Sequence, residues 1–338
     1  MLTLRRLVKS LEAHRRAHPV RFWVQTFAVA LTAALFLLVR TFWLPDTLFV
    51  VLLVPALAFG RAREFLRRFV PFIGLLLVYD SFRSIADNLN RSVHFLVMPD
   101  FDKFVFDGVL PTEWLQNSWW VGHASWYDFY FFSLYSFHFL APILMALLIW
   151  WRRSDLYWPY VWAFVMLSFA AFVTFLLFPA APPWLAAKKG YIQPVHYIVG
   201  EVWRAMGMKK YTEIYRHMSP NKVAAVPSLH AAYPALMVLF AARAFGWRRT
   251  WWLALYPVSI WVGIVYLGEH YVFDVVLGVA YATATYQAVS WLFLSKREPE
   301  YGPVSDTRST NAREPPLEAA RASSRESGRS LRADDPTS

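Results

Sequence analysis

A histidine and an aspartate stand four residues apart in the stretch YLGEHYVFDVVLG, residues 266–278, at the start of an apolar run that continues to Leu294. Side chains four positions apart lie on one face of a helix, so Asp274 can accept a hydrogen bond from one ring nitrogen of His270. This bond would fix the tautomer and leave the lone pair of the other nitrogen available for attack. The competing interpretation is a structural pair that holds the end of a helix in place.

A second histidine lies in the stretch VPSLHAAYP, residues 226–234. Pro227 suits the beginning of a helix, and Ser228 can cap it. The amides of the first turn would then form an anion site. His230 lies in that turn, where it could donate a proton to a departing oxygen. It could equally be an interfacial histidine that only hydrates its edge.

Together the two stretches supply a complete set for phosphoryl transfer without a metal. One histidine would attack phosphorus, the other would protonate the leaving group, and the aspartate would orient the first. A zinc site built from the same three residues is the alternative, although the sequence has no HExxH-like pair. The chain has no cysteine, which excludes disulfides, thiolate nucleophiles and Cys-ligated metals. We therefore expect neither a metal nor another cofactor.

The elements that must position these residues are membrane-spanning helices. Of the 338 residues, 57% are hydrophobic and only 17% are charged, where a soluble domain has roughly 25% charged residues. Apolar runs of about 20 residues predict spanning helices. We predict eight, at about 22–44, 46–60, 69–86, 126–151, 157–178, 228–245, 250–267 and 271–294. The expected fold is an all-α, polytopic membrane protein.

Basic residues in the short loops predict the orientation of these helices. They fall on the same side as the basic N-terminus, at residues 61–68, 152–153, 248–249 and 296–297. The positive-inside rule makes that side cytoplasmic. We therefore expect a multi-pass plasma-membrane protein with cytoplasmic termini and a site that faces the periplasm or exterior. The same loops explain the net charge of +11, and because their residues are scattered we expect no nucleic-acid partner.

The chain divides by composition into four parts. A basic interfacial segment, 1–21, precedes a transmembrane hairpin, 22–68. A six-helix membrane domain follows at 69–295, and within it residues 99–118 predict an amphipathic segment on the membrane surface. The remainder, 296–338, is rich in Arg, Ser, Glu and Pro, which predicts a disordered cytoplasmic tail.

The two histidine motifs resemble those of a known family. PSLH, followed by Y-x-x-x-H-Y-x-x-D-V-x-x-G, is similar to the second and third signature motifs of the type 2 phosphatidic acid phosphatase superfamily. Leu229 in place of the more usual glycine, FPAAPPW at 178–184 and YDSFRSIAD at 79–87 resemble its inositol phosphorylceramide synthase branch, bacterial members in particular. The resemblance spans about 70–295. It implies His270 as the nucleophile that forms a phosphohistidine, Asp274 as its partner, His230 as the general acid, and no metal.

The chain departs from the superfamily pattern where that pattern binds phosphate. It lacks the Lys and Arg-Pro of the first motif and the Ser-Arg of the third, where Tyr266 and Leu267 stand instead. Other groups must therefore hold the phosphate, and the candidates are Arg83, Ser228, Lys188 and Lys189. Substrate contacts are predicted at Tyr79, Asp87, Trp184 and Tyr271. His138, in the middle of a predicted helix, is interpreted as a structural histidine that hydrogen-bonds within the bundle.

These observations predict an integral-membrane phosphotransferase. It would move a phosphate-linked headgroup, phosphoinositol by resemblance, from a phospholipid or polyprenyl-type lipid phosphate to a lipid or sugar hydroxyl. With water as the acceptor, the same site would be a lipid phosphate or pyrophosphate phosphatase. A transporter or a non-catalytic scaffold is the alternative from another class, and it is disfavoured because the ionisable groups lie at helix ends and the chain shows no repeat.

Overall fold

The computed structural model describes residues 12–13, 15–38, 45–86, 92–138, 140–207 and 223–295. These residues belong to one compact unit, which ends at Ser295. Their regular elements are helices, accompanied by two isolated β-bridges, so the predicted all-α class is confirmed. The predicted tail and most of the predicted interfacial segment lie outside the described residues.

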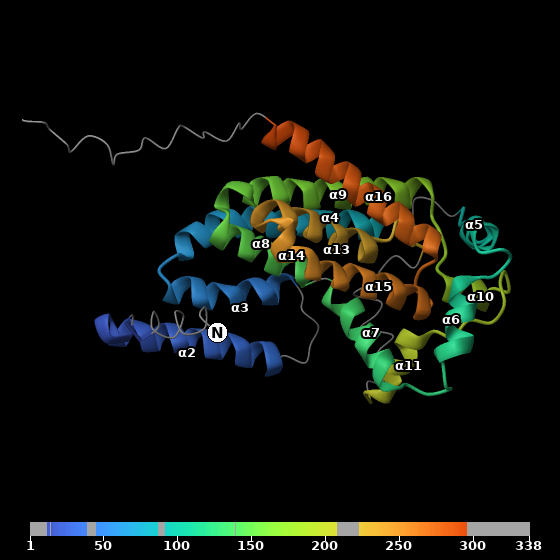
Figure 1. Ribbon diagram of the computed structural model, residues 1–338, viewed down its shortest axis with the longest axis horizontal. Coiled ribbons are helices and arrows are strands. Elements are labelled where there is room, and N and C mark those ends of the chain that lie inside the picture. The colour runs from blue at the N-terminus through green and yellow to red at the C-terminus, as the bar shows by residue number, and fades with distance from the viewer. Residues whose placement is uncertain are drawn as a thin grey trace, which may run out of the picture. The chain divides into compact units, whose positions relative to one another are not determined.

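The chain contains both long and short helices (Figure 1). In order, they are α2 (Pro19–Leu38), α3 (Pro45–Ala58), α4 (Ala62–Ala86), α5 (Val97–Val105), α6 (Pro111–Trp119), α7 (Trp126–Phe137), α8 (Ala141–Arg152), the 3₁₀ turn η1 (Ser154–Leu156), α9 (Tyr157–Leu177), α10 (Pro183–Lys188), α11 (Ile198–Ala205), α13 (Leu229–Phe245), α14 (Trp247–Thr250), the 3₁₀ turn η2 (Trp251–Ala254), α15 (Leu255–Tyr266), α16 (Val272–Val289) and the π-turn η3 (Ser290–Leu294). Helices α2, α3 and α4 pack in chain order, and α4 then packs against α9.

Two of these helical stretches are long and apolar enough to cross a membrane. The first is Ser154–Leu177, which joins η1 to α9, and the second is Val272–Leu294, which joins α16 to η3. The bent pair α7 and α8 becomes a third if it forms a single span. By length and composition, the described residues therefore support a membrane protein with two or three spans, and the set of eight stays a prediction.

The predicted helix over 126–151 is wrong in one respect, because it consists of two helices. α7 ends at Phe137, α8 begins at Ala141, and their axes are bent by 56°. Pro142 lies in the first turn of α8. A proline is tolerated there, but its ring and its missing amide disfavour a helix that runs straight through from α7. The predicted helix over 250–267 is also interrupted, by η2.

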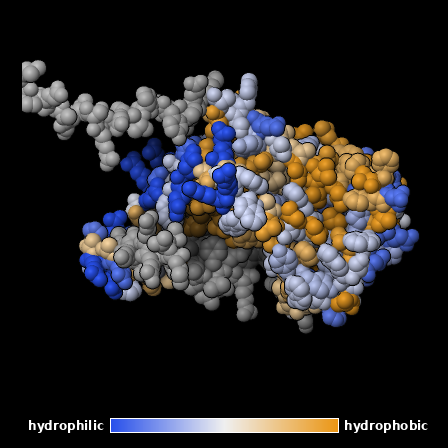
Figure 2. All heavy atoms as spheres, viewed as in Figure 1, coloured by the Kyte–Doolittle hydropathy of each residue, from blue (hydrophilic) through white to orange (hydrophobic). Residues whose placement is uncertain are grey.

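Apolar and charged surfaces separate on the face seen in Figure 2. Apolar atoms spread over the surface around α15 and α16, and hydrophilic atoms gather around α14, whose sequence is WRRT. Val258 on α15 and Val276 on α16 are both at least half exposed. Exposed valines on helices of a membrane protein are expected where the helices face lipid.

The centre of the bundle is α13, which packs against α8, α9, α15 and α16. Tyr160 of α9 and Phe240 of α13 are fully buried and meet edge to face, with ring centroids 5.2 Å apart. α16 turns Gly278 toward the first turn of α13, where a Cβ atom would overlap the carbonyl oxygen of Ser228. Only glycine permits this approach, which brings the beginnings of α13 and α16 together.

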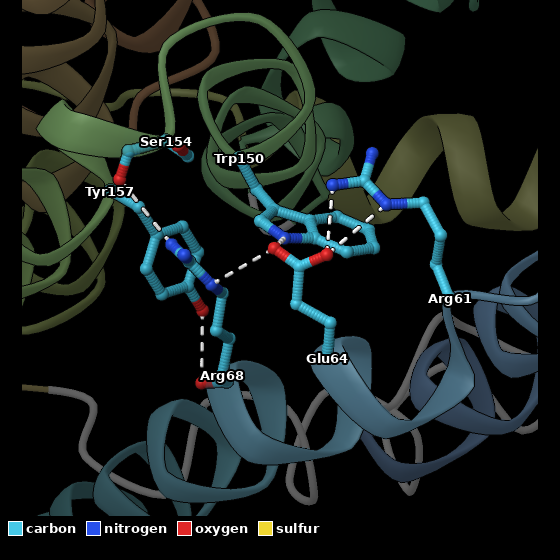
Figure 3. Close-up of polar contacts among 6 residues, drawn as sticks. All are labelled: Arg61, Glu64, Arg68, Trp150, Ser154 and Tyr157. Carbon is cyan, nitrogen blue, oxygen red and sulfur yellow. Dashed lines mark hydrogen bonds and ion pairs between the residues drawn. The ribbon is translucent and has the colours of Figure 1, made fainter.

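A polar cluster joins α4, α8 and α9 at one end of the bundle (Figure 3). Glu64 accepts hydrogen bonds from Arg61 and from the indole of Trp150, each at 2.8 Å. Glu64 also pairs with Arg68 at 3.5 Å, and the Tyr157 hydroxyl donates to the carbonyl oxygen of Arg68 at 3.0 Å. These five residues form what we call the Glu64 cluster.

The other end of α9 leads into a lobe of short helices, α5, α6, α10 and α11 (Figure 1). α5 and α6 cover the predicted amphipathic segment, and their exposed side includes Phe104 and Trp114, which are 86% and 58% exposed. Their inward side carries polar groups such as Gln116, whose amide donates to the carbonyl oxygens of His196 and Tyr266 at 2.9 and 2.8 Å. This arrangement fits the predicted amphipathic character.

Candidate active site

His270 and Asp274 meet at the beginning of α16. Nδ1 of His270 lies 3.2 Å from Oδ2 of Asp274, and the same oxygen accepts a hydrogen bond from the amide of Tyr271 at 2.9 Å. Tyr271 is the N-cap of α16, so Asp274 is its third residue and reaches back across the helix end. The predicted contact is present, but it crosses the N-terminus instead of following one helical face, because His270 precedes the helix.

His230 lies in the first turn of α13, as predicted. Ser228 is the N-cap, and its Oγ accepts a hydrogen bond from the amide of Ala231 at 3.3 Å, so the predicted cap is present. Nδ1 of His230 lies 3.2 Å from Nε2 of His270. The structure thus joins His230, His270 and Asp274 in one chain of contacts.

The order of these contacts assigns the protons. An ionised carboxylate can only accept, so Nδ1 of His270 donates to Asp274, and in a neutral ring this leaves a lone pair on Nε2. That lone pair in turn accepts from Nδ1–H of His230. The proton that His230 can give therefore faces Nε2 of His270, which is the nitrogen that can attack. Asp274 is fully buried, whereas His230 is partly exposed.

Further contacts fix α13, α16 and α5 relative to one another. The amide of Ser228 donates to the carbonyl oxygen of Asp274 at 3.1 Å. From α5, the carboxylate of Asp102 accepts from the amides of Val272 and Phe273, each at 2.9 Å. Burial raises the pKa of Asp102 from 3.8 to about 6, and the two amide hydrogen bonds act against this rise. An acid at this helix end satisfies first-turn amides beside the site.

The turn before His270 holds a third buried acid, Glu269, which is 6% exposed. The preceding residue, Gly268, has a φ of +80°, which favours glycine. Its carbonyl oxygen accepts a hydrogen bond from the amide of Trp184 at 3.1 Å. Burial raises the pKa of Glu269 from 4.5 to about 8, while the neighbouring side chains of Trp184 and Tyr197 act to lower it.

The structure does not bring the two predicted lysines or Tyr79 to the two histidines as it brings Asp274. Lys188 and Lys189 are exposed at the end of α10, and no described contact joins them to the site. Tyr79 is buried on α4 in a small cluster with Phe172. Asp87 and the side chain of Arg83 lie outside the described part of the chain.

Two predicted substrate contacts lie near the site, packed into the protein. Tyr271 is fully buried in a cluster with Met98 and Leu110, and its hydroxyl has no hydrogen-bond partner among the described residues. Trp184 is half-buried, with its ring centroid 5.0 Å from that of Tyr197. In the described ranges, no three His, Cys, Asp or Glu side chains are grouped as a metal ion would require, so the zinc alternative gains no support.

Sequence reasoning missed the contributions of Asp102 and Glu269. Asp102 was part of the surface segment without a role of its own, yet it is fully buried, whereas Asp100 on the same helix is exposed. The available signal was its position on the inward side of an amphipathic helix. Glu269 stands directly before His270, and its signal was a carboxyl in an otherwise apolar turn.

One family model covers both histidine motifs of this chain. A family model described as PAP2 superfamily matches residues 106–288, more than half of the chain. No solved structure gave a significant match.

The curated relatives share one kind of name. A phosphoinositol dihydroceramide synthase of Bacteroides thetaiotaomicron is 28% identical to this chain over 80% of this chain and 83% of its own. An inositol phosphorylceramide synthase of Candida albicans is 25% identical over 48% of this chain and 35% of its own. The catalytic subunit of the Schizosaccharomyces pombe inositol phosphorylceramide synthase is 28% identical over 43% and 36%. The protein is thus a member of the PAP2 superfamily and an enzyme of this metal-independent phosphatase and phosphotransferase family, similar to the inositol phosphorylceramide synthases.

Proposed function

We propose that this enzyme is a lipid headgroup phosphotransferase that works through a phosphohistidine on His270. The observation that carries the proposal is the direction of the His270 ring. Its Nδ1 lies 3.2 Å from Asp274, so its Nε2 faces His230, also at 3.2 Å. A nucleophile next to a proton donor, with an acid that orients it, is the arrangement that covalent phosphoryl transfer needs.

In the first half of the reaction, Nε2 of His270 attacks the phosphorus of the donor lipid. The bond from phosphorus to the oxygen of the donor alcohol breaks, and that oxygen takes the proton from Nδ1 of His230, which acts as an imidazolium and is left as a neutral ring. The phosphorylated ring of His270 carries positive charge, which the carboxylate of Asp274 stabilises. The headgroup phosphate is then attached to the enzyme, and the lipid alcohol can leave.

In the second half, an acceptor hydroxyl takes the place of the departed alcohol. Its oxygen attacks phosphorus while its proton passes to Nδ1 of His230, and the bond from phosphorus to Nε2 breaks. Both rings return to their starting protonation states. If water enters instead, the enzyme releases the phosphate and acts as a phosphatase, the second function that these groups can perform.

The separation of the two rings indicates what the substrate must do. Attack and leaving-group protonation along one line need the two nitrogens roughly 6 Å apart, and in the structure they are 3.2 Å apart. The substrate phosphate therefore has to enter between the rings and replace their mutual hydrogen bond.

The substrate proposal rests on the curated relatives. Their names describe transfer of a phosphoinositol group to a ceramide-type lipid. We propose the same class here: a phosphoinositol phospholipid as the donor and the hydroxyl of a sphingoid-type lipid as the acceptor. The apolar surface around α15 and α16 would keep the lipid tails beside the site (Figure 2).

We further propose that the site faces away from the cytoplasm in the plasma membrane. Arg68 donates to the carbonyl oxygen of Ser154, and Arg153 to that of Ala244 at 2.8 Å, so the basic loops share the end of the bundle far from His270. This arrangement supports cytoplasmic termini and a six-helix domain over 69–295 behind the hairpin 22–68. Because the chain has no cysteine, single cysteines can test it. An impermeant maleimide should label His123→Cys in intact cells and Arg248→Cys only after permeabilisation.

The decisive experiment follows a labelled phosphate. Purified enzyme receives phosphatidylinositol labelled at phosphorus and a ceramide acceptor, and the products are separated. We expect label in a new sphingolipid and an acid-labile, base-stable label on the protein that His270→Gln abolishes. Label only in water-soluble products would favour the phosphatase, and a turnover unaffected by His270→Gln would overturn the proposal.

A further inference from the structure

A third histidine, His138, lies against the proposed general acid. It follows the last residue of α7, is 3% exposed, and its ring centroid lies 3.8 Å from that of His230. A buried ionisable group within a predicted membrane span is costly and needs a reason. The structural role expected from the sequence, a hydrogen bond within the bundle, does not account for its contact with His230.

The end of α7 orients the His138 ring. Helix ends leave carbonyl groups without an intrahelical partner, and here Nδ1 of His138 lies 2.7 Å from the carbonyl oxygen of Tyr135. A carbonyl oxygen only accepts, so Nδ1 carries the hydrogen in the neutral ring. The break between α7 and α8 thus provides both the place and the tautomer of His138.

The His230 ring is held by two aromatic contacts. Tyr135 stacks on it with ring centroids 4.3 Å apart and planes 11° apart, and His138 contacts it at 44°. The rings of Tyr135 and His138 are 6.1 Å apart, so they contact different parts of the imidazole. The electron-rich face of tyrosine favours a positive ring. Both contacts limit the rotation that would turn Nδ1 of His230 away from His270.

We propose that His138 is a positioning residue that keeps Nδ1 of His230 directed at the leaving oxygen. This inference rests on the proposed role of His230 as the proton donor. A phenyl ring could fill the same space but would lack the hydrogen bond to Tyr135 that sets the angle of the ring.

Other groups around the three histidines belong to the same environment. The Tyr233 hydroxyl and Ser168 Oγ are 2.8 Å apart, and the Tyr233 ring lies 6.3 Å from that of His138. Asp274 supplies the carboxylate, on the far side of His270.

The test uses two donors that share one headgroup and differ in the leaving group. One releases a lipid alcohol, which needs a proton to depart, and the other releases a nitrophenolate, which does not. The rate of the first half of the reaction is measured as release of the leaving group in a single turnover. His138→Phe should lower this rate roughly 10- to 100-fold for the first donor and less than about threefold for the second. His138→Asn, which can still donate to the Tyr135 carbonyl, should recover part of the loss. His123→Ala, an exposed histidine outside the site, is the matched control.

The outcomes separate this inference from the function on which it rests. An equal loss with both donors, or full activity of His138→Phe, overturns the positioning role. If the Phe variant does not elute as a folded protein in detergent, the Asn variant carries the same comparison. His230→Ala should show the same dependence on the leaving group with a larger loss. If His230→Ala shows none, His230 is not the proton donor and the proposed mechanism itself fails.

Discussion

Two groups of polar residues, one near each end of α9, differ in exposure and in pairing. At its beginning, the Glu64 cluster is partly open to solvent, with the side chain of Glu64 39% exposed and paired with two arginines. Near its end lie Glu269, Asp274 and Asp102, all buried, and in the described ranges no lysine or arginine pairs with them. α9 has 21 residues, so about 30 Å separates the Glu64 cluster from the three buried acids.

This difference indicates that the Glu64 cluster holds helices together, whereas the buried acids belong to a site that performs chemistry. Exposed ion pairs contribute at most about 1 kcal/mol, and the Glu64 cluster joins three helices at little cost. Buried acids without a cation are unfavourable and are kept where their proton affinity is used. The contrast therefore supports the assignment of chemistry to the end with His230 and His270, independently of the motif match.

The largest expected effect is a loss of turnover on changing His270, compared with a change of Glu64 at the other end of α9. His270→Gln should lower turnover by at least roughly 10³-fold, because the nucleophile is lost. Glu64→Gln, which removes the central charge of the other cluster, should leave turnover within about twofold. Both are measured as headgroup transfer by protein that elutes as a single species. Comparable losses in the two variants would erase the distinction between the clusters.

A smaller but still large loss is expected for Asp274→Asn. The amide of asparagine can donate to Nδ1 of His270, which would move the ring proton to Nε2 and occupy the attacking lone pair. Turnover should fall roughly 10²- to 10⁴-fold, and the acid-labile label on the protein should disappear. A variant that still accumulates the phosphoenzyme at the wild-type rate would show that Asp274 does not set the tautomer.

Glu269 predicts a dependence of stability on pH. Its pKa is 4.5 in an ordinary setting and about 8 in the folded protein, so between these values the folded state binds more protons than the unfolded state. This contribution to stability is present below pH 4.5 and is lost as the pH rises through 8. It amounts to roughly 3–5 kcal/mol.

Glu269→Gln should remove that contribution. The difference in Tm between variant and wild type, measured in detergent by scanning fluorimetry, should therefore favour the variant increasingly from pH 5.5 to 8.5. Glu64→Gln serves as the control at the exposed cluster, where no such trend is expected. A parallel course of the wild-type and Glu269→Gln curves would contradict the buried, uncompensated state of this acid.

Two glycines allow the comparison to be extended to the backbone. A Cβ at Gly278 would overlap the carbonyl oxygen of Ser228, whereas a Cβ at Gly74 of α4 meets nothing within 4 Å. Gly278→Ala should destabilise the protein by about 1–3 kcal/mol and lower turnover, because α16 moves away from α13. Gly74→Ala should be neutral or stabilising by up to about 1 kcal/mol. Chemical denaturation measures both.

The smallest effect is expected within the Glu64 cluster itself. Arg61→Gln removes one partner of Glu64 and leaves Arg68 and Trp150 in place. Its cost should stay below about 1 kcal/mol and vanish at high salt, because exposed pairs are screened. A shift of Tm much larger than a few degrees would mean that this cluster is more deeply coupled to the fold than its exposure indicates.

Sequence reasoning succeeded where the partners are close in the chain. Ser228 and Ala231, and likewise His270 and Asp274, are local pairs whose contacts could be expected from helix capping and spacing. The apolar runs also predicted where the long helices lie, because spanning helices are set by length and hydropathy. The bend before Pro142 was missed, although a proline in the interior of a predicted helix is itself a signal of a kink or a break.

The rest depends on contacts between distant segments. His138 reaches His230, and Asp102 reaches Val272, only after the helices have packed. The sequence could suggest a structural histidine at His138 and an inward-facing acid at Asp102, but not the residues that they contact. The same holds for Glu269, whose unusual proton affinity arises from burial by the lobe of short helices.

The hydrogen bond between His230 and His270 also affects the enzyme while no lipid is bound. A lone pair that is already engaged by a neighbouring proton cannot attack phosphorus, so in the proposed mechanism the nucleophile stays blocked while the site is empty. A phosphate that enters between the rings would free the nucleophile and the proton donor in one step.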